Sequence, residues 1–333
     1  MRARIERSSP IIVLLILCIL SSACDGSTKS EPRLAFVSNR DGHEEIYLVN
    51  ADGSGLVRLT ESTGRSKDPA WSPDASVLAF TSDRDGDWDI YVMDIGEGQV
   101  TRLTDSPGSD VWPVWSPDGR KLAFVSDRDG QFEVYTMDVD GANQVRLTHS
   151  EGGMSLFPAW SSGNEIAVAT GKADQISICL MGFDGSDVRC PVPGSRNTGE
   201  PRWSPAGKQI VFQWGHEYDV HIYVIETNTN RLQQLTRGSL EGFPVWSPDG
   251  NRIAYICLTN LCIMDSDGTD QVQMGQAMGI REPPAWSPDS KKIAFASVSD
   301  GDEEIYVIDI DGSRITKITD NDFSDTQPVW APQ

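Results

Sequence analysis

Residues Pro113 to Thr148 read PVWSPDGRKLAFVSDRDGQFEVYTMDVDGANQVRLT, and this segment reveals how the chain folds. A second copy, PAWSPDASVLAFTSDRDGDWDIYVMDIGEGQVTRLT, begins at Pro69. Each copy divides into four short apolar runs separated by turn residues. In the turn Ser116-Pro117-Asp118-Gly119, for example, Pro presets its φ and Gly accepts a positive φ. The repeat therefore predicts four short strands joined by hairpins.

A Pro-x-Trp tripeptide marks this repeat along the chain. Its tryptophans are separated by 44, 45, 43, 43, 40 and 44 residues and are Trp71, Trp115, Trp160, Trp203, Trp246, Trp286 and Trp330. A period near 43 residues that contains several short strands is typical of a β-propeller with one blade per repeat. Runs such as Leu122–Val125 are apolar at successive positions, which indicates small sheets buried on both faces between neighbouring blades.

The two ends of the chain carry incomplete repeats. The first three-strand unit, Leu34–Thr60, has no Pro-x-Trp segment before it, and the last segment, Pro328–Trp330, has no three strands after it. We expect the C-terminal segment to supply the innermost strand of the first blade. The sequence therefore predicts an all-β, seven-bladed propeller of four-stranded blades without an open sheet edge. A six-bladed ring is the alternative.

The consensus WSPDG..LAF.SDRDG..EIY.MD.DG....LT resembles the repeat of the TolB-type propellers, also called WD40-like or PD40 repeats. The resemblance covers almost the whole chain after the first 33 residues. It implies a cell-envelope protein of the kind that engages a peptidoglycan-associated lipoprotein, although TolB-type proteins carry an additional N-terminal α/β domain where this chain has a short polar segment. Similar blades also cap prolyl oligopeptidase-like peptidases and form sugar-processing enzymes.

The N-terminus reads as an export signal. Arginines precede the ten-residue apolar run Ile11–Leu20, and small residues follow it up to Cys24. The run is too short to cross a membrane, which takes about 20 apolar residues. We expect residues 1–23 to form a signal peptide, residues 24–33 a flexible tether and residues 34–333 a single propeller domain.

Cys24 is a candidate lipidation site. The sequence Ser-Ser-Ala-Cys resembles a bacterial lipobox, which predicts a membrane-anchored lipoprotein. Alternatively, ordinary signal peptidase cuts after Ala23 and releases a soluble periplasmic or secreted protein. An unpaired thiol at a new N-terminus favours the lipid anchor. In a Gram-negative cell, Asp25 after the cysteine resembles a signal for retention at the inner membrane.

Four further cysteines fall in two blades as local pairs. Cys179 with Cys190, and Cys257 with Cys262, would each link adjacent strands in an oxidising compartment. The alternative is four buried thiols that pack as small apolar residues.

The formal net charge of −21 makes nucleic acid a poor partner. Much of the acidity belongs to repeated turns. The series Asp83, Asp85, Asp87 and Asp89 suggests Ca²⁺ as a possible ligand, but recurring turn residues explain it better because an EF-hand would need a central Gly and a distal Glu. No cofactor or metal is therefore predicted, and we expect a monomer.

Catalytic signatures are sparse. The chain has four histidines and no Gly-x-Ser-x-Gly nucleophile elbow, so peptidase and histidine-rich metal-lyase chemistry match it poorly. His216 and His221 flank Glu217 and Asp219 in one predicted hairpin, which is better explained as a solvated turn than as a metal site. We predict that the protein is not an enzyme.

The position directly before each Pro of Pro-x-Trp varies between repeats, and it should ring one mouth of the channel. It is occupied by Asp68, Trp112, Phe157, Glu200, Phe243, Pro283 and Gln327. Between Pro and Trp, six copies have Ala or Val and one has Arg202. Aromatic residues beside charges in a concave site are typical of binding sites. These residues, apart from Pro283, are therefore candidate binding residues. The alternative is that the aromatics complete the core of a neighbouring blade.

The sequence thus predicts a non-enzymatic, extracytoplasmic, lipid-anchored propeller that acts as a protein-protein interaction scaffold in the bacterial cell envelope. The alternative is a carbohydrate-binding or carbohydrate-active propeller with Asp68 and Glu200 as its carboxylates and the aromatics as sugar platforms.

Overall fold

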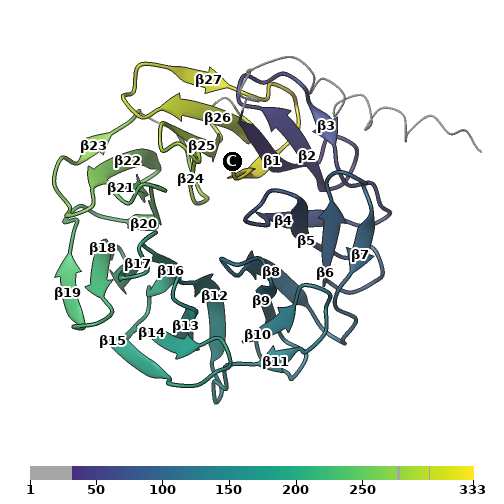
Figure 1. The fold of residues 1–333 in the computed structure, drawn as a ribbon. Coiled ribbons are helices and arrows are strands. Elements are labelled where there is room, and N and C mark those ends of the chain that lie inside the picture. Colours follow the sequence, from purple (N-terminus) through teal and green to yellow (C-terminus); the bar gives the residue numbers. More distant parts are fainter. Residues whose placement is uncertain (1–31, 276–277, 300) are drawn as a thin grey trace, which may run out of the picture.

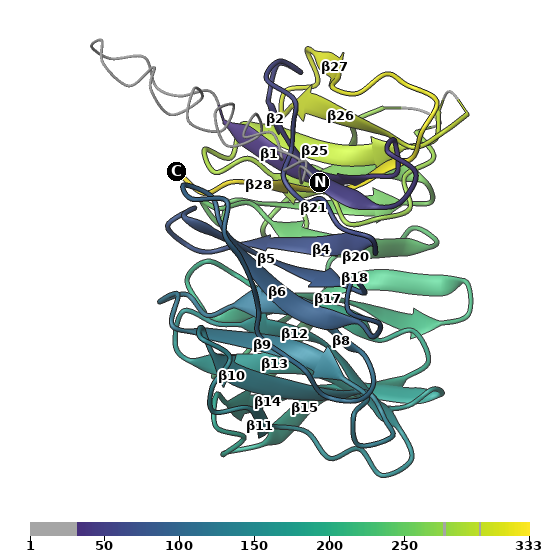
Figure 2. The same cartoon turned by 90° about the vertical axis from the view of Figure 1, so that its right-hand side faces the viewer.

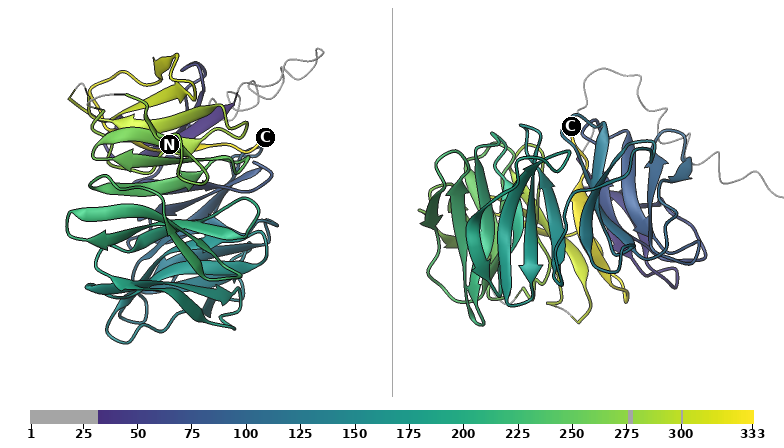
Figure 3. Two further views of the ribbon diagram at one scale, coloured as in Figure 1. Left: turned by 90° about the vertical axis from the view of Figure 1, so that its left-hand side faces the viewer. Right: turned by 90° about the horizontal axis from the view of Figure 1, so that it is seen from below.

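Seven small antiparallel sheets stand around a central axis and form a closed ring (Figure 1). The computed structural model describes residues 32–275, 278–299 and 301–333. The predicted signal peptide, Cys24 and most of the tether lie outside these ranges. Seen on edge, the ring is a thick disc (Figures 2 and 3). Within the described ranges, no helix is long and apolar enough to cross a membrane.

Each sheet is one blade of four strands, and the strands follow one another from the channel outward. Blade 1 contains β28 (Asp325–Trp330), β1 (Arg33–Ser38), β2 (Glu45–Asn50) and β3 (Val57–Arg58); blade 2 contains β4 (Ser66–Trp71), β5 (Val77–Ser82), β6 (Asp89–Asp94) and β7 (Val100–Arg102). Blade 3 contains β8 (Asp110–Trp115), β9 (Lys121–Ser126), β10 (Glu133–Asp138) and β11 (Val145–Arg146); blade 4 contains β12 (Met154–Trp160), β13 (Glu165–Lys172), β14 (Gln175–Gly182) and β15 (Arg189–Ser195). Blade 5 contains β16 (Gly199–Trp203), β17 (Gln209–His216), β18 (Asp219–Glu226) and β19 (Arg231–Gln234); blade 6 contains β20 (Glu241–Trp246), β21 (Arg252–Cys257), β22 (Asn260–Asp265) and β23 (Val272–Gln273). Blade 7 contains β24 (Ala285–Trp286), β25 (Lys292–Ser297), β26 (Glu304–Asp309) and β27 (Ile315–Lys317).

The predicted ring closure is confirmed. Strand β28, at the C-terminal end of the chain, pairs antiparallel with β1, with Leu34 opposite Trp330 and Ala35 opposite Val329. The first and last repeats therefore share blade 1, and the seven-bladed prediction holds over the six-bladed alternative.

The turns between the first two strands of a blade form as their residues predict. In blade 3 the N–H of Gly119 donates to the carbonyl of Ser116 at 2.9 Å, and Gly119 has φ 69°. The Ser116 hydroxyl donates to Asp118 Oδ1 at 2.7 Å. The repeated Ser-Pro-Asp-Gly sequence is thus a local hydrogen-bonded turn, and its aspartate has a structural role.

The hydrophobic core consists of seven clusters, one between each pair of neighbouring blades. The phenylalanines of the second strands are fully or almost fully buried in them: Phe36, Phe80, Phe124, Phe212 and Phe295. Both faces of each sheet are covered by a neighbour. This explains why the strands are apolar at successive positions instead of alternating with polar residues.

The repeated tryptophans join each blade to the one before it. The indole N–H of Trp115, for example, donates to the carbonyl of Ala70 in blade 2 at 2.9 Å, and its ring packs into the cluster between blades 2 and 3. The same bond, at 3.0 to 3.2 Å, is made by Trp160, Trp203, Trp286 and Trp330. The tryptophans therefore have a mainly structural role, as core residues between blades.

Both predicted disulfides are present. Cys179 on β14 is bonded to Cys190 on β15, and Cys257 on β21 is bonded to Cys262 on β22. Each links adjacent strands of one blade.

Candidate functional site

The residues before the repeated prolines share one unusual backbone conformation. All except Pro283 have a positive φ, between 52° and 55°: Asp68, Trp112, Phe157, Glu200, Phe243 and Gln327. At each of these positions the register of the inner strand shifts against its neighbour, as in a β-bulge. A non-glycine residue with positive φ is strained, and bulges re-aim side chains. Five of the six side chains line the central cavity.

Blade 7 departs from this pattern for a local reason. The pyrrolidine ring fixes the φ of Pro283 near −65°, so the left-handed conformation is closed to it. Strand β24 is accordingly only two residues long, Ala285–Trp286, where the other inner strands have five to seven. The residue before Pro283, Glu282, lines the cavity as well. We did not predict Glu282 as a site residue, although the Glu282-Pro283-Pro284 run is a visible departure from the repeat.

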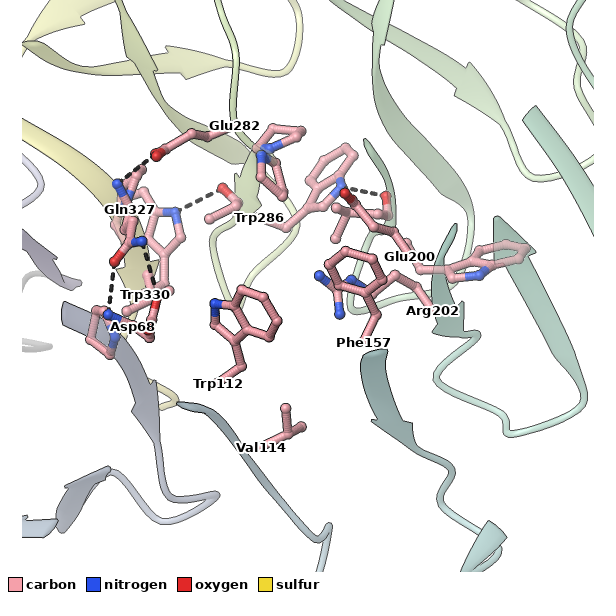
Figure 4. Close-up of a pocket in the computed structure, with 18 of the residues that line it drawn as sticks. Asp68, Trp112, Val114, Phe157, Glu200, Arg202, Glu282, Trp286, Gln327 and Trp330 are labelled. Atoms are coloured by element: carbon pink, nitrogen blue, oxygen red, sulfur yellow. Dashed lines mark hydrogen bonds between the residues drawn. The ribbon is translucent and has the colours of Figure 1, made fainter. Parts of the chain in front are cut away.

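The cavity has a volume of about 590 Å³ and occupies the central channel (Figure 4). A volume of this size is within the range of ligand-binding pockets. Its wall is largely apolar and includes the proline of five Pro-x-Trp segments: Pro69, Pro113, Pro158, Pro284 and Pro328. The position between Pro and Trp also faces it, through Val114, Val245, Ala285, Val329 and Arg202. The charge of Arg202 therefore enters the cavity.

One arc of the wall is acidic and spans blades 7, 1 and 2. The backbone N–H of Gln327 donates to Glu282 Oε2 at 2.8 Å. The Gln327 side chain then accepts from the backbone N–H of Asp68 at 2.8 Å and donates to Asp68 Oδ1 at 3.1 Å (Figure 4). Burial raises the pKa of both Asp68 and Glu282 above their ordinary values. Gln327 thus links the closing strand to both neighbouring blades.

A second arc is aromatic and spans blades 3 and 4. The rings of Trp112 and Phe157 stack with centroids 5.9 Å apart and an angle of 23° between their planes. Phe157 also packs against the core cluster between blades 4 and 5. Trp112 is 38% exposed, so its ring is available at the cavity wall.

Glu200 and Arg202 come from blade 5 and complete the charged lining. Glu200 is 8% exposed and makes no hydrogen bond or ion pair with another described residue. Burial raises its pKa to about 7, and the positive charge of Arg202 offsets only part of that rise. Glu200 is therefore a buried acid that faces the cavity and lacks a direct partner in the described part of the chain.

Phe243 is placed differently from the other candidate residues. It packs against the core cluster between blades 6 and 7 and does not line the cavity. Its backbone N–H donates to Gln213 Oε1 at 3.2 Å. We therefore leave Phe243 out of the proposed binding residues, since its side chain completes a core, as the alternative interpretation of the aromatics expects.

The acidic turns and the histidine hairpin have protein partners of their own. Asp85 accepts from the Tyr91 hydroxyl at 2.5 Å, and buried Asp89 accepts from Arg102 Nη2 at 2.6 Å. His221 lies 2.8 Å from Asp219 and 3.2 Å from Glu241. Among the described residues, no group of three or more His, Cys, Asp or Glu side chains could hold a metal ion.

Sequence comparison identifies short stretches shared with TolB proteins. The chain is 46% identical to a Protein TolB homolog of Chlorobaculum tepidum over 46 residues, which are 14% of this chain and 11% of that protein. It is 48% identical to the Tol-Pal system protein TolB of Geobacter sulfurreducens over 40 residues, 12% of this chain and 9% of that protein. The matches thus span only about a tenth of the length of these curated relatives.

Solved structures share the fold at low identity. TolB from Acinetobacter baumannii has a TM-score of 0.61 and 20% identity, covering 91% of this chain and 67% of that one. An oligogalacturonate lyase in complex with manganese has a TM-score of 0.68 and 14% identity, and the match covers 88% of this chain and 87% of the lyase. A puromycin-hydrolyzing peptidase from Mycobacterium tuberculosis has a TM-score of 0.68 and 15% identity, and the match covers 84% of this chain and 50% of the peptidase. These similarities demonstrate the fold alone, because it is used by proteins with different activities.

A family model matches a much larger part of the chain than the pairwise comparisons do. It is described as the TolB beta propeller domain (PD40), and it matches residues 84–236 and 242–333. Together with the repeat and the closed seven-bladed ring, this match over more than half of the residues shows that the chain belongs to the TolB beta propeller domain family.

Proposed function

We propose that this protein is a non-enzymatic, extracytoplasmic binding protein of the bacterial cell envelope that holds a partner protein at the mouth of its channel. The family supports this proposal, and so do the names of relatives in the Tol-Pal system. The pattern of basic, apolar and small residues up to Cys24 supports export and a lipid anchor. Together they suggest a propeller tethered to a membrane with its channel open to a partner.

The exposed ring of Trp112 is the observation that carries the binding role. The residue is 38% exposed at a cavity wall although it is large and apolar, and its φ of 55° is strained for a tryptophan. Tryptophan is a frequent anchor residue of protein interfaces, because it contributes a large and rigid contact area. Stacking on Phe157 covers only part of this side chain, and contact with a partner would cover the rest.

The test is capture of a partner from envelope extract by the wild-type protein and two matched variants. Trp112→Asn removes the ring and places a residue that tolerates positive φ. Leu258→Asn is the control, since Leu258 is also exposed (61%) and also has a positive φ (60°) but does not line the cavity. We expect Trp112→Asn to lose the captured protein and Leu258→Asn to keep it. Equal capture by both variants would refute binding at the channel.

A carbohydrate function is the second candidate, favoured by one observation. Glu200 has a pKa of about 7 in a wall that also contains an exposed tryptophan. A carboxylic acid with a raised pKa is suited to general acid catalysis of glycosidic cleavage, and an indole ring can stack on a sugar. A thermal-shift screen against oligosaccharides discriminates the two functions, because only a carbohydrate-binding cavity is stabilised by them.

A further inference from the structure

We propose that the cavity receives a cationic side chain of the partner, a lysine ammonium or an arginine guanidinium on its aliphatic stem. This inference rests on the binding function proposed above and adds to it the chemistry that the channel recognises. Three properties of the cavity support it: its charge, its shape and its unpartnered groups.

The cavity lining contains more acidic than basic side chains. Among the described residues of the wall, three are acidic, Asp68, Glu200 and Glu282, and one is basic, Arg202. None of the three acids forms an ion pair within 4.0 Å with a described cation. In their ionised form these acids outnumber Arg202, so the field in the cavity then favours a positive group, and a low-dielectric channel strengthens such an interaction relative to bulk water.

Two of these carboxyl groups also have unused hydrogen-bonding capacity. Glu200 is 8% exposed and has no hydrogen bond to another described residue, although it faces the cavity. Asp68 Oδ1 accepts from Gln327, and its buried Oδ2 forms no hydrogen bond of good geometry, although the Thr81 hydroxyl lies close enough to lower the pKa of Asp68. Buried polar groups are normally hydrogen-bonded, and an unpaired buried carboxylate is costly. A donor supplied by a partner would satisfy them.

The shape of the wall fits a long amphipathic side chain. The acidic arc lies across blades 7, 1 and 2, whereas the stacked Trp112 and Phe157 rings lie across blades 3 and 4 (Figure 4). The aliphatic stem of lysine or arginine packs on apolar surface and carries its charge at the tip. A cation above an indole face gains a further attraction. Prolines and aromatic rings would hold the stem while a carboxylate accepts from the head.

Other ligand classes fit this lining less well. An anion could approach Arg202 only near Glu200, in a cavity whose other side carries Asp68 and Glu282 (Figure 4). A neutral sugar carries no positive charge that could pair with the carboxyl group of Glu200. A divalent ion would need several ligating groups converging on one point, and the described residues provide no such group of three acidic, histidine or cysteine side chains.

Titration calorimetry of the full exported protein with three blocked peptides tests the proposal. The probes are Gly-Gly-Lys-Gly-Gly, its arginine counterpart and its norleucine counterpart, which keeps the aliphatic stem without the charge. We expect the lysine and arginine peptides to bind at least about tenfold more tightly than the norleucine peptide, because a desolvated charge pair is worth at least that factor. Equal affinity of all three peptides would overturn the proposal.

Glu200→Gln separates direct contact from the general field of the acidic surface. We expect it to weaken lysine-peptide binding by about tenfold or more. Glu44→Gln is the matched control, because Glu44 is close enough to affect the pKa of Asp68 and Glu282 but does not line the cavity. An equal loss in both variants would overturn contact with Glu200. If Glu200→Gln does not fold, Glu200→Asp keeps the charge and must retain the preference for lysine over norleucine.

Failure of this inference is distinguishable from failure of the binding function. If no peptide binds while Trp112→Asn still loses partner capture and Leu258→Asn does not, cationic recognition is refuted and channel binding stands. If capture is insensitive to Trp112, the binding function itself fails, whatever the peptides do.

Discussion

Residue 200 combines burial with an ionisable group. Glu200 lies on the cavity wall at 8% exposure, and its folded-state pKa of about 7 compares with 4.5 for the free side chain. The carboxyl group is protonated in both folded and unfolded states at low pH. Between about pH 4.5 and 7 the unfolded chain ionises first, so folding loses stability as pH rises.

This difference gives a prediction for pH. Relative to Glu200→Gln, the wild-type protein should lose about 3 kcal/mol of folding stability as pH rises from about 4 to about 8, with the loss complete above about pH 7. Chemical denaturation of both proteins across this range measures it. Parallel pH profiles for the two proteins would contradict the burial of an unpartnered acid at this position.

Trp112 and Phe243 have the same backbone conformation but different surroundings. Trp112 is exposed at the cavity, whereas Phe243 packs between blades 6 and 7. Phe243→Ala should cost about 2 to 3 kcal/mol, as expected for a partly buried phenylalanine, and Trp112→Asn should change stability by less than about 1 kcal/mol. Urea denaturation of both variants measures the contrast. A large loss in Trp112→Asn would assign this ring to the core.

Strand β28 is the element on which the ring depends. It pairs with β1 and places Trp330 in the cluster between blades 7 and 1. Through Gln327 it also contacts Asp68 on β4 and Glu282 in the segment before β24. Without it, the edge of β1 is open to other chains and two core clusters lose residues.

Deletion of residues 326–333 should therefore produce an aggregating or protease-sensitive protein. Deletion of residues 332–333 is the matched control, because these two residues follow β28 and the strand itself stays intact. Thermal melting and limited proteolysis of the two truncated proteins measure the effect. An unchanged melting curve for the longer deletion would show that the ring does not depend on this closure.

The inner strands show which features of a blade can be predicted from its repeat and which cannot. The turns, the strand order and the two disulfides follow from local signals such as Asp-Gly pairs and cysteine spacing. The left-handed residues at Asp68 and its counterparts carry no local signal, because a bulge forms from the pairing of two strands. Pro283 is the exception, since the ring of proline excludes that conformation by itself.

The propeller as a whole is a closed disc with many acidic turns. The proposed anchor would hold this disc near a membrane by residues before β1. A single acyl group gives only marginal membrane binding, so the diacylglycerol and amide-linked chains of a lipoprotein are expected to be needed for stable anchoring.

Cys24→Ala should shift the protein from the membrane fraction to the soluble fraction and remove the lipid mass from its N-terminus. Cys18→Ala is the matched control, because Cys18 lies in the apolar run that precedes the proposed cleavage site. Detergent partition and mass spectrometry of both variants measure the effect. A wild-type protein that is already soluble would support the alternative, in which ordinary signal peptidase cuts after Ala23 and Cys24 carries no lipid.

The architecture can be predicted from the amino-acid sequence alone, because each blade repeats the same local turns and the same doubly buried strands. Counting Pro-x-Trp segments was enough to predict seven blades and the closure by Trp330. The nature of the cavity wall, in contrast, emerges only from the folded ring. Asp68, Gln327 and Glu282 are far apart along the chain and meet only when the ring closes, and Glu200 is buried on a cavity wall to which several blades contribute. Local sequence encodes turns and strands, whereas hydrogen bonding and burial of a charge depend on which distant residues surround it.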